Sequence, residues 1–164
     1  MAIAGQLTDL TLPLSQIAAL ALRPRRVIVS ENKMTFLTLP PMPGTLAIWG
    51  HAYRASLLQH LPWLTGTDII YWGDLDVHGF QILNQVRSHY PPAKSLMMDK
   101  ATYRAFRQFV TTGKPSPVTH LPHLTEAEAL MHRYLRLHNL RLEQERISHS
   151  YVLERLEEVD LSGS

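Results

Sequence analysis

The stretch IIYWGDLDVHG at residues 69–79 decides how we interpret this chain. An apolar run is followed by Asp74 and Asp76, and Gly79 then leads into a helical pattern. Side chains at positions i and i+2 of a strand point to the same side, so both carboxylates can face one point. Neighbouring carboxylates repel each other unless a proton, a hydrogen bond or a cation compensates. Hard oxygen ligands at the end of a strand therefore predict a site for Mg²⁺ or Mn²⁺.

The composition is that of an ordinary globular protein of 164 residues, with 45% hydrophobic and 18% charged residues. The absence of cysteine excludes disulfides, Cys-ligated zinc and thiol nucleophiles. The net charge of +2 is not the basic excess of a nonspecific DNA-coating protein, so any contact with DNA must be local. No apolar window reaches the roughly 20 residues of a membrane span. We therefore expect a cytoplasmic protein with no membrane contact.

Predicted strands and helices alternate along the chain. Such alternation predicts an α/β fold, Rossmann-like, in which a mostly parallel sheet carries helices on both faces. We expect residues 1–22 to form an N-terminal extension with a linker helix, and residues 23–160 to form the main domain. The predicted strands are 27–29, 45–49, 69–76 and 95–98. The predicted helices are 14–22, 53–61, 80–86, 102–110, 125–138 with a capping box at Thr125 and Glu128, and 151–159, while 141–147 fits either type.

Acidic residues follow three of the predicted strands: Glu31, the pair Asp74 and Asp76, and Asp99. In parallel α/β sheets, ligands bind beyond the carboxyl ends of the strands, which lie along one edge. A single acid there is often a turn or cap residue, and this is the stronger interpretation for Asp99 alone. Glu31 is different, because Glu is a poor turn former and here follows a buried strand. Several carboxylates on one edge favour a bound cation.

Three further residues could contact a phosphate. Gly79 lies where a helix begins, and glycine lets backbone N–H groups approach an anion closely, although packing of the helix on the strand explains it equally well. His78 could contact a phosphate or act as an acid, and an exposed loop histidine is the alternative. Lys33 could neutralise a phosphate or be an ordinary surface lysine.

Glu31 together with the pattern Asp74-x-Asp76-x-x-Gly79 resembles the Toprim signature of topoisomerases, primases and some nucleases. Longer stretches resemble the C-terminal domain of JetD, the nuclease subunit of Wadjet anti-plasmid systems, over about residues 8–158. They are ENKMTFL at 31–37, PWL at 62–64, YWGDLDVHGF at 71–80 and RLEQERI at 141–147.

The resemblance implies a Toprim-like catalytic domain that cleaves DNA with Mg²⁺ or Mn²⁺, beside an SMC-type motor complex that senses closed circular plasmids. Family members carry a further N-terminal region for DNA engagement and assembly, which is missing from this sequence. We therefore expect the chain to be either a fragment of a longer protein or a naturally short one, and whether it cleaves DNA alone stays open. The implied partners are DNA and SMC-type complex subunits, and the domain could also form a homodimer.

Carried over by position, the resemblance implies that Glu31, Asp74 and Asp76 are catalytic and bind metal. It implies a second, later acidic pair of metal ligands, Glu143 and Glu145. In a strand these two would share a face, and in a helix they would point apart. A solvated helical face that also carries Arg141 and Arg146 is the alternative.

Two other functions remain open at this stage. A Toprim-like fold without activity could serve for dimerisation or docking in an SMC-type complex. A receiver-like domain with Asp74 as phosphoryl acceptor is the weaker hypothesis, because it leaves Glu31 without a role.

Overall fold

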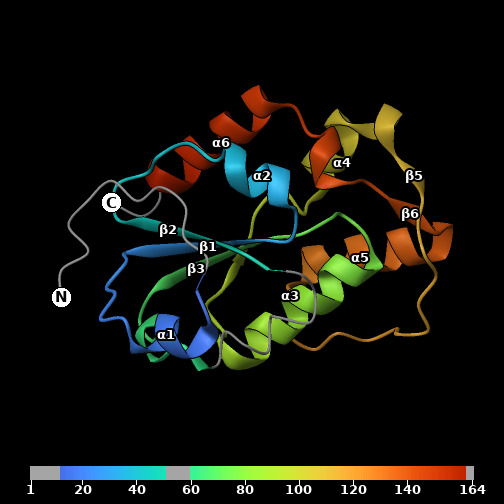
Figure 1. The fold of residues 1–164 in the computed structure, drawn as a ribbon. Helices are drawn as coiled ribbons and strands as arrows, with labels where there is room; N and C mark the ends of the chain where they lie inside the picture. The colour runs from blue at the N-terminus through green and yellow to red at the C-terminus, as the bar shows by residue number, and fades with distance from the viewer. Residues whose placement is uncertain (1–11, 51–59, 162–164) are drawn as a thin grey trace.

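A four-stranded parallel sheet forms the centre of the structure, a computed structural model that describes residues 12–50 and 60–161 (Figure 1). The strand order is β2-β1-β3-β4. In the register, Val27 of β1 lies opposite Leu46 of β2 and Ile69 of β3. The strands are β1 (Arg26–Ser30), β2 (Thr45–Trp49), β3 (Asp68–Trp72) and β4 (Lys94–Ser95).

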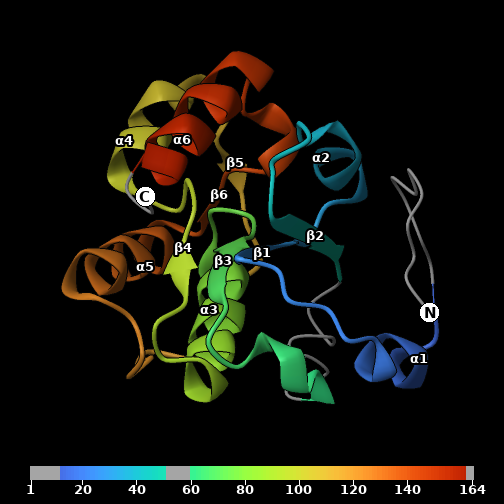
Figure 2. The same ribbon diagram turned by 90° about the vertical axis from the view of Figure 1, so that its left-hand side faces the viewer.

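Helices cover both faces of this sheet, which confirms the predicted α/β class. In Figures 1 and 2, α2 and α6 lie on one side of the sheet, and α1, α3 and α5 lie on the other. The helices are α1 (Leu14–Ala19), α2 (Lys33–Thr38), α3 (Val77–His89), α4 (Lys100–Ala105), α5 (Glu126–His138) and α6 (His149–Leu161). Short 3-10 turns are η2 (Pro62–Leu64), η3 (Arg107–Phe109) and η4 (Gln144–Arg146), and β5 (Thr111–Thr112) pairs antiparallel with β6 (Leu140–Arg141).

The core forms around β1, whose five residues are all buried. Val27 and Ile28 are inaccessible to solvent, as are Phe80 and Leu83 of α3. β-branched residues favour the extended backbone and pack well in a sheet covered on both faces. Full burial of each such side chain contributes about 1.5–3 kcal/mol. Burial of the central strand β1 is therefore a main source of the stability of the sheet.

Two predicted strand ends are wrong, and both errors have a local cause. β3 ends at Trp72 instead of residue 76, because the Leu75 N–H and C=O pair with Leu142 at 2.9 and 3.1 Å and draw the chain out of the parallel sheet. Asp74 and Asp76 therefore lie in a loop and not on one face of a strand. β4 ends at Ser95, because Met97 adopts a left-handed φ of 55° that no strand can continue.

Most other predicted elements are present with shifted ends. The capping box at Thr125 and Glu128 begins α5, as predicted. The ambiguous segment 141–147 divides into the end of β6 and the turn η4. The predicted helix 53–61 falls almost entirely outside the described residues. No helix within 12–50 and 60–161 has the length and apolar content needed to cross a membrane.

The predicted N-terminal extension contains α1, which packs against the main domain. Trp63 Nε1 donates a hydrogen bond of 3.0 Å to the carbonyl oxygen of Ile17, and the side chains of Leu14 and Ile17 pack against the core. The boundary at residue 23 stays a prediction.

A buried ion pair joins α3 to α5. Arg87 donates through Nη1 and Nη2 to the two carboxylate oxygens of Glu128, the second bond measuring 2.9 Å, and Ser95 of β4 donates to the same carboxylate at 2.6 Å. Burial alone would raise the pKa of Glu128, but the hydrogen bonds from Arg87, Ser95 and the Thr125 N–H outweigh it and lower that pKa to about 2. The pair therefore favours the folded state wherever Glu128 is ionised.

Substituting Glu128→Gln tests this ion pair. Because Arg87 would keep its buried charge without a counter-ion, we expect the free energy of unfolding at pH 7 to fall by about 3–5 kcal/mol. The folded-state pKa lies below the ordinary value of 4.5, so the stabilisation is complete above pH 4.5 and is lost as the pH falls toward 2. Urea titrations across this range should show that the difference in unfolding free energy between the variant and the unsubstituted protein shrinks as the pH falls.

The exposed neighbour Glu126 in the same helical turn provides the control, as Glu126→Gln. It should leave the unfolding free energy nearly unchanged. Equal stability of the Glu128→Gln protein and the unsubstituted protein at pH 7 would contradict the role assigned to the pair.

Candidate active site

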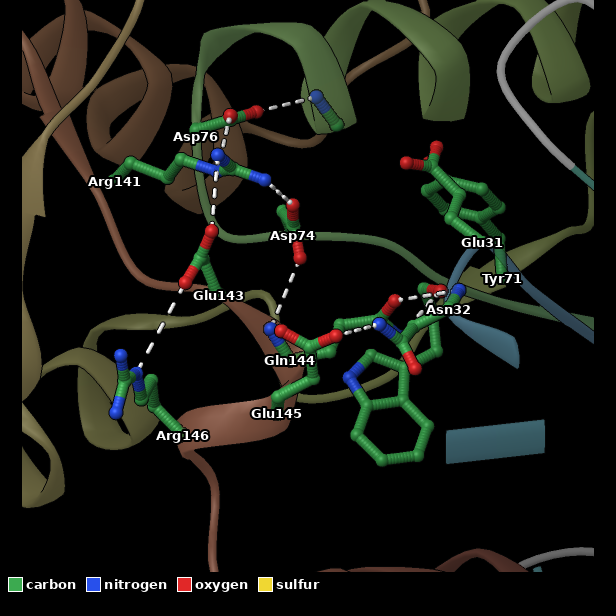
Figure 3. A network of polar contacts seen from close by, with 12 residues as sticks. Glu31, Asn32, Tyr71, Asp74, Asp76, Arg141, Glu143, Gln144, Glu145 and Arg146 are labelled. Atoms are coloured by element: carbon green, nitrogen blue, oxygen red, sulfur yellow. Dashed lines mark hydrogen bonds and ion pairs between the residues drawn. The ribbon is translucent and has the colours of Figure 1, made fainter. Parts of the chain in front are cut away.

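Three of the predicted acidic residues, Glu31, Asp74 and Asp76, gather at the carboxyl edge of the parallel strands. Glu31 directly follows β1, and Asp74 and Asp76 lie in the loop between β3 and α3. The segment 140–146, which follows α5, approaches this loop from a distant part of the chain (Figure 3). The site is therefore built from three segments that only the fold brings together.

Arg141 lies among three of the carboxylates. Its Nη2 is 2.5 Å from Asp74 Oδ2, its Nε is 3.5 Å from Asp76 Oδ2, and its Nη1 is 3.1 Å from Glu143 Oε1 (Figure 3). Burial alone would lower the pKa of Arg141, but the hydrogen bond and charge of Asp74, with the charges of Glu143 and Asp76, raise it. The guanidinium thus supplies the positive charge that these carboxylates require.

Glu31 lies beside this group and is bound by a different residue. The hydroxyl of the buried Tyr71 donates a hydrogen bond to Glu31 Oε1. Burial raises the pKa of Glu31 to about 7; the bond from Tyr71 opposes this rise, and the charges of Asp74 and Asp76 add to it. Below pH 7 the folded chain therefore keeps a proton on Glu31 that the unfolded chain releases near pH 4.5. As the pH rises from 4.5 to 7, the free energy of unfolding falls, because only the unfolded chain has ionised this group.

Asp76 combines two roles at the start of α3. Its Oδ1 accepts a hydrogen bond of 2.8 Å from the Gly79 N–H and so caps the helix. Burial raises the pKa of Asp76, the bond from Gly79 opposes the rise, and the charge of Asp74 adds to it. The charge of Asp74 thus raises the pKa of both Glu31 and Asp76, and the charge of Asp76 raises that of Glu31, so the three carboxylates lie close enough to interact.

The structure explains Gly79 by packing. A Cβ atom at this position would overlap the carbonyl oxygen of Asp74, so only glycine fits against the preceding loop. Its N–H is already bonded to Asp76. His78 is half-buried in the first turn of α3, and its charge acts on Asp76.

Lys33 and Asp99 lie apart from the Arg141 group. Lys33 is exposed on α2, with its Nζ 5.3 Å from the centre of the Trp49 ring. Asp99 caps α4 by accepting from the Thr102 N–H at 2.7 Å, and it pairs with Arg155 at 3.1 Å. The capping interpretation of Asp99 is therefore the correct one.

Glu143 and Glu145 point to different partners. Glu143 faces Arg141, whereas Glu145 lies on η4 and accepts a 2.5 Å hydrogen bond from Asn32 Nδ2 (Figure 3). The two carboxylates do not face each other, because the 3-10 turn rotates successive side chains apart.

Gln144, between these two glutamates, is a site residue that the sequence patterns did not single out. It is only 2% exposed. Its Oε1 accepts from the Asn32 N–H at 3.1 Å, its Nε2 donates to the Trp72 carbonyl at 2.8 Å, and its own N–H donates to Asp74 Oδ1 at 2.9 Å. Gln144 thus fixes the ends of β1 and β3 relative to each other, and with them Glu31 and Asp74.

The carboxylates suit a hard divalent cation in their chemistry, since Mg²⁺ and Mn²⁺ prefer oxygen ligands. Within residues 12–50 and 60–161, however, no three His, Cys, Asp or Glu side chains are arranged to hold a metal ion. Arg141 fills the position between Asp74 and Asp76. A cation at these residues would therefore compete with the guanidinium.

The parallel sheet flanked by helices, with carboxylates along its carboxyl edge, defines a Rossmann-like α/β domain consistent with the Toprim fold. The chain belongs to the family described as Wadjet protein JetD, C-terminal, whose model matches residues 1–156. The match confirms the predicted resemblance. Membership of this family indicates a role in the Wadjet anti-plasmid system and in a multi-subunit assembly. Among curated proteins, none matches the chain.

Substituting Gln144→Leu tests its positioning role. The change leaves the Asn32 N–H and the Trp72 carbonyl without partners, so we expect the free energy of unfolding to fall by about 1–3 kcal/mol. Gln144→Glu should be at least as destabilising, because a carboxylate cannot donate to Trp72 and adds negative charge beside Asp74. Urea denaturation measures both effects.

The exposed Gln108 supplies the matched control, as Gln108→Leu. The role of Gln144 would be refuted if its leucine variant were as stable as this control.

Proposed function

We propose that this domain is a metal-dependent DNA endonuclease module of an anti-plasmid defence system, hydrolysing phosphodiester bonds with Mg²⁺ or Mn²⁺. The observation that carries the proposal is the gathering of Glu31, Asp74 and Asp76 at the carboxyl edge of the sheet, where the charges of Asp74 and Asp76 raise the pKa of Glu31. Membership of the JetD C-terminal family supports it. The proposed partners are DNA and the SMC-type subunits of the complex.

Asp74 and Asp76 would hold the cation, and Glu143, which shares Arg141 with them, could complete the set. Glu145 would take part only after leaving Asn32. When bound, a divalent cation polarises the scissile phosphate and lowers the pKa of a nearby water. For these acids to bind it, the guanidinium of Arg141 has to move aside and could then face a phosphate oxygen instead.

Glu31 is suited to act as the general base. A pKa of about 7 lies near neutral pH, where a base is both partly ionised and strong enough to accept a proton. The carboxylate would take the proton of the water that attacks phosphorus, while the leaving oxygen departs from the opposite side. Tyr71, which donates to Glu31, would keep the carboxylate oriented.

Phosphate contacts are the second part of the proposal. His78 is half-buried in the first turn of α3, two residues after Asp76, and Lys33 is exposed on α2, two residues after Glu31. Lys33 would have to leave the Trp49 ring to reach a phosphate. The N–H of Gly79 could contribute only if Asp76 released it.

The alternative is a domain that serves only for dimerisation or docking. It is favoured by one observation, the neutralisation of Asp74 and Asp76 by Arg141, since a purely structural ion network needs no metal. The nuclease requires Mn²⁺ or Mg²⁺ to bind, whereas a docking domain does not.

Nicking of supercoiled plasmid in the presence of Mn²⁺ tests the nuclease. We expect the Asp74→Asn and Asp76→Asn double variant to nick more slowly by about a hundredfold or more, because each loses a charged ligand. Asn at residue 76 can still accept the Gly79 N–H, so the helix cap and the fold should survive. Calorimetric titration with Mn²⁺ should show binding to the unsubstituted chain and a loss of binding in the double variant.

Asp99→Asn is the matched control, because it removes a carboxylate from a strand-end loop but keeps the cap of α4. Its nicking rate and Mn²⁺ binding should match those of the unsubstituted chain. Undiminished nicking by the double variant would rule out the nuclease site, and an unsubstituted chain that neither nicks nor binds Mn²⁺ would favour the docking domain.

A further inference from the structure

We propose that the groove between α4 and α5 binds an acidic amphipathic helix of a protein partner. The groove has a volume of about 660 Å³ and is lined by residues of α4, η3 and α5 and by Ser95 of β4. Figure 2 shows the ribbons of α4 and α5 on the same side of the molecule. None of its lining residues belongs to the acidic edge described above. The inference therefore stands apart from the proposed cleavage chemistry.

The floor and one wall of the groove are apolar. Met98, Tyr103 and Met131 form the buried floor. Leu130 and Tyr134 on α5 rise from it with 61% and 40% of their surface exposed, and Leu137, also 61% exposed, continues the same helical stripe. An apolar stripe of this kind on a surface helix is typical of a site that receives the apolar face of another helix.

The opposite rim carries positive charge. Lys100, Arg104 and Arg107 are exposed and follow one another at spacings of four and three residues, so they lie along one side of α4 and η3. Among the described residues, none of the three forms an ion pair with a carboxylate.

The carboxylates that line the groove cannot neutralise this rim. Asp99 pairs with Arg155, and Glu128 pairs with Arg87. The groove thus combines apolar surface with three cations that lack acidic partners, and acidic side chains beside an apolar stripe would complement both.

The walls are held in place before any partner binds. Glu128 anchors α5 to α3 and β4 through Arg87 and Ser95. Where the floor meets the wall, the rings of Tyr103 and Tyr134 pack edge to face with centroids 5.5 Å apart. Preorganised walls reduce the entropy that a partner loses on binding.

Two other occupants fit less well. A DNA backbone would satisfy the cations but leave Leu130 and Leu137 exposed to water. A second copy of this chain would bring an identical set of cations to the interface, where like charges oppose association.

Fluorescence anisotropy with labelled peptides tests the inference on the full chain. The probe is a helical peptide with leucines at i, i+3 and i+7 and glutamates flanking them. We expect saturable binding that weakens by about tenfold or more in the double variant Arg104→Glu, Arg107→Glu and in Leu130→Asp. A peptide with lysines in place of the glutamates should bind more weakly than the acidic one.

The control is the double variant Arg23→Glu, Lys114→Glu, which makes the same change in net charge at exposed residues outside the groove lining and outside α5. It should bind the acidic peptide like the unsubstituted chain, as should Asp74→Asn, which leaves the groove intact. Thermal melting of every variant establishes that the fold is retained.

Three results would overturn the inference. The first is no saturable binding of the acidic peptide, or binding that the groove variants leave unchanged. The second is binding of a short DNA duplex that the Arg104 and Arg107 reversals abolish while Leu130→Asp leaves it intact. The third is a dimer in sedimentation experiments that Leu130→Asp dissociates, which would make the face a contact between copies.

Discussion

The acidic residues at the carboxyl edge of the sheet depend on one interaction, the ion network of Arg141. Asp74, Asp76 and Glu143 converge on one guanidinium, with nitrogen–oxygen distances between 2.5 and 3.5 Å. Carboxylates gathered around one point repel one another and oppose the fold unless positive charge lies among them. Arg141 supplies that charge and ties β6 to the loop after β3. The backbone pairing of Leu75 with Leu142 supports the same junction.

Those parts of the fold that depend on local sequence were predictable. The β-branched run of β1, the capping box of α5 and the acids after the strands follow from short-range patterns. What the patterns missed depends on residues distant in sequence. β3 ends early because the backbone of Leu142 forms hydrogen bonds with that of Leu75, just after the strand. No sequence pattern singled out Gln144, whose three hydrogen bonds reach Asn32, Trp72 and Asp74.

Two surfaces of opposite charge lie on one small domain, although the net charge is only +2. The acidic edge suits a cation and, through it, a phosphate. The groove beside α4 carries Lys100, Arg104 and Arg107 over an apolar floor and suits an acidic protein segment. The buried pair of Arg87 and Glu128 holds α3, α5 and β4 together and thereby keeps the groove in a fixed place relative to the sheet. This separation would let a catalytic domain be held by a partner without covering its site.

Thermal unfolding of Arg141→Met with and without Mn²⁺, at matched ionic strength, tests most directly whether this edge is a cation site. The account predicts that the variant is less stable than the unsubstituted chain in metal-free buffer, because three carboxylates lose their counter-ion. It also predicts that Mn²⁺ raises the melting temperature of the variant more than that of the unsubstituted chain, since the metal no longer competes with a guanidinium. A variant whose melting temperature Mn²⁺ leaves unchanged would contradict the account.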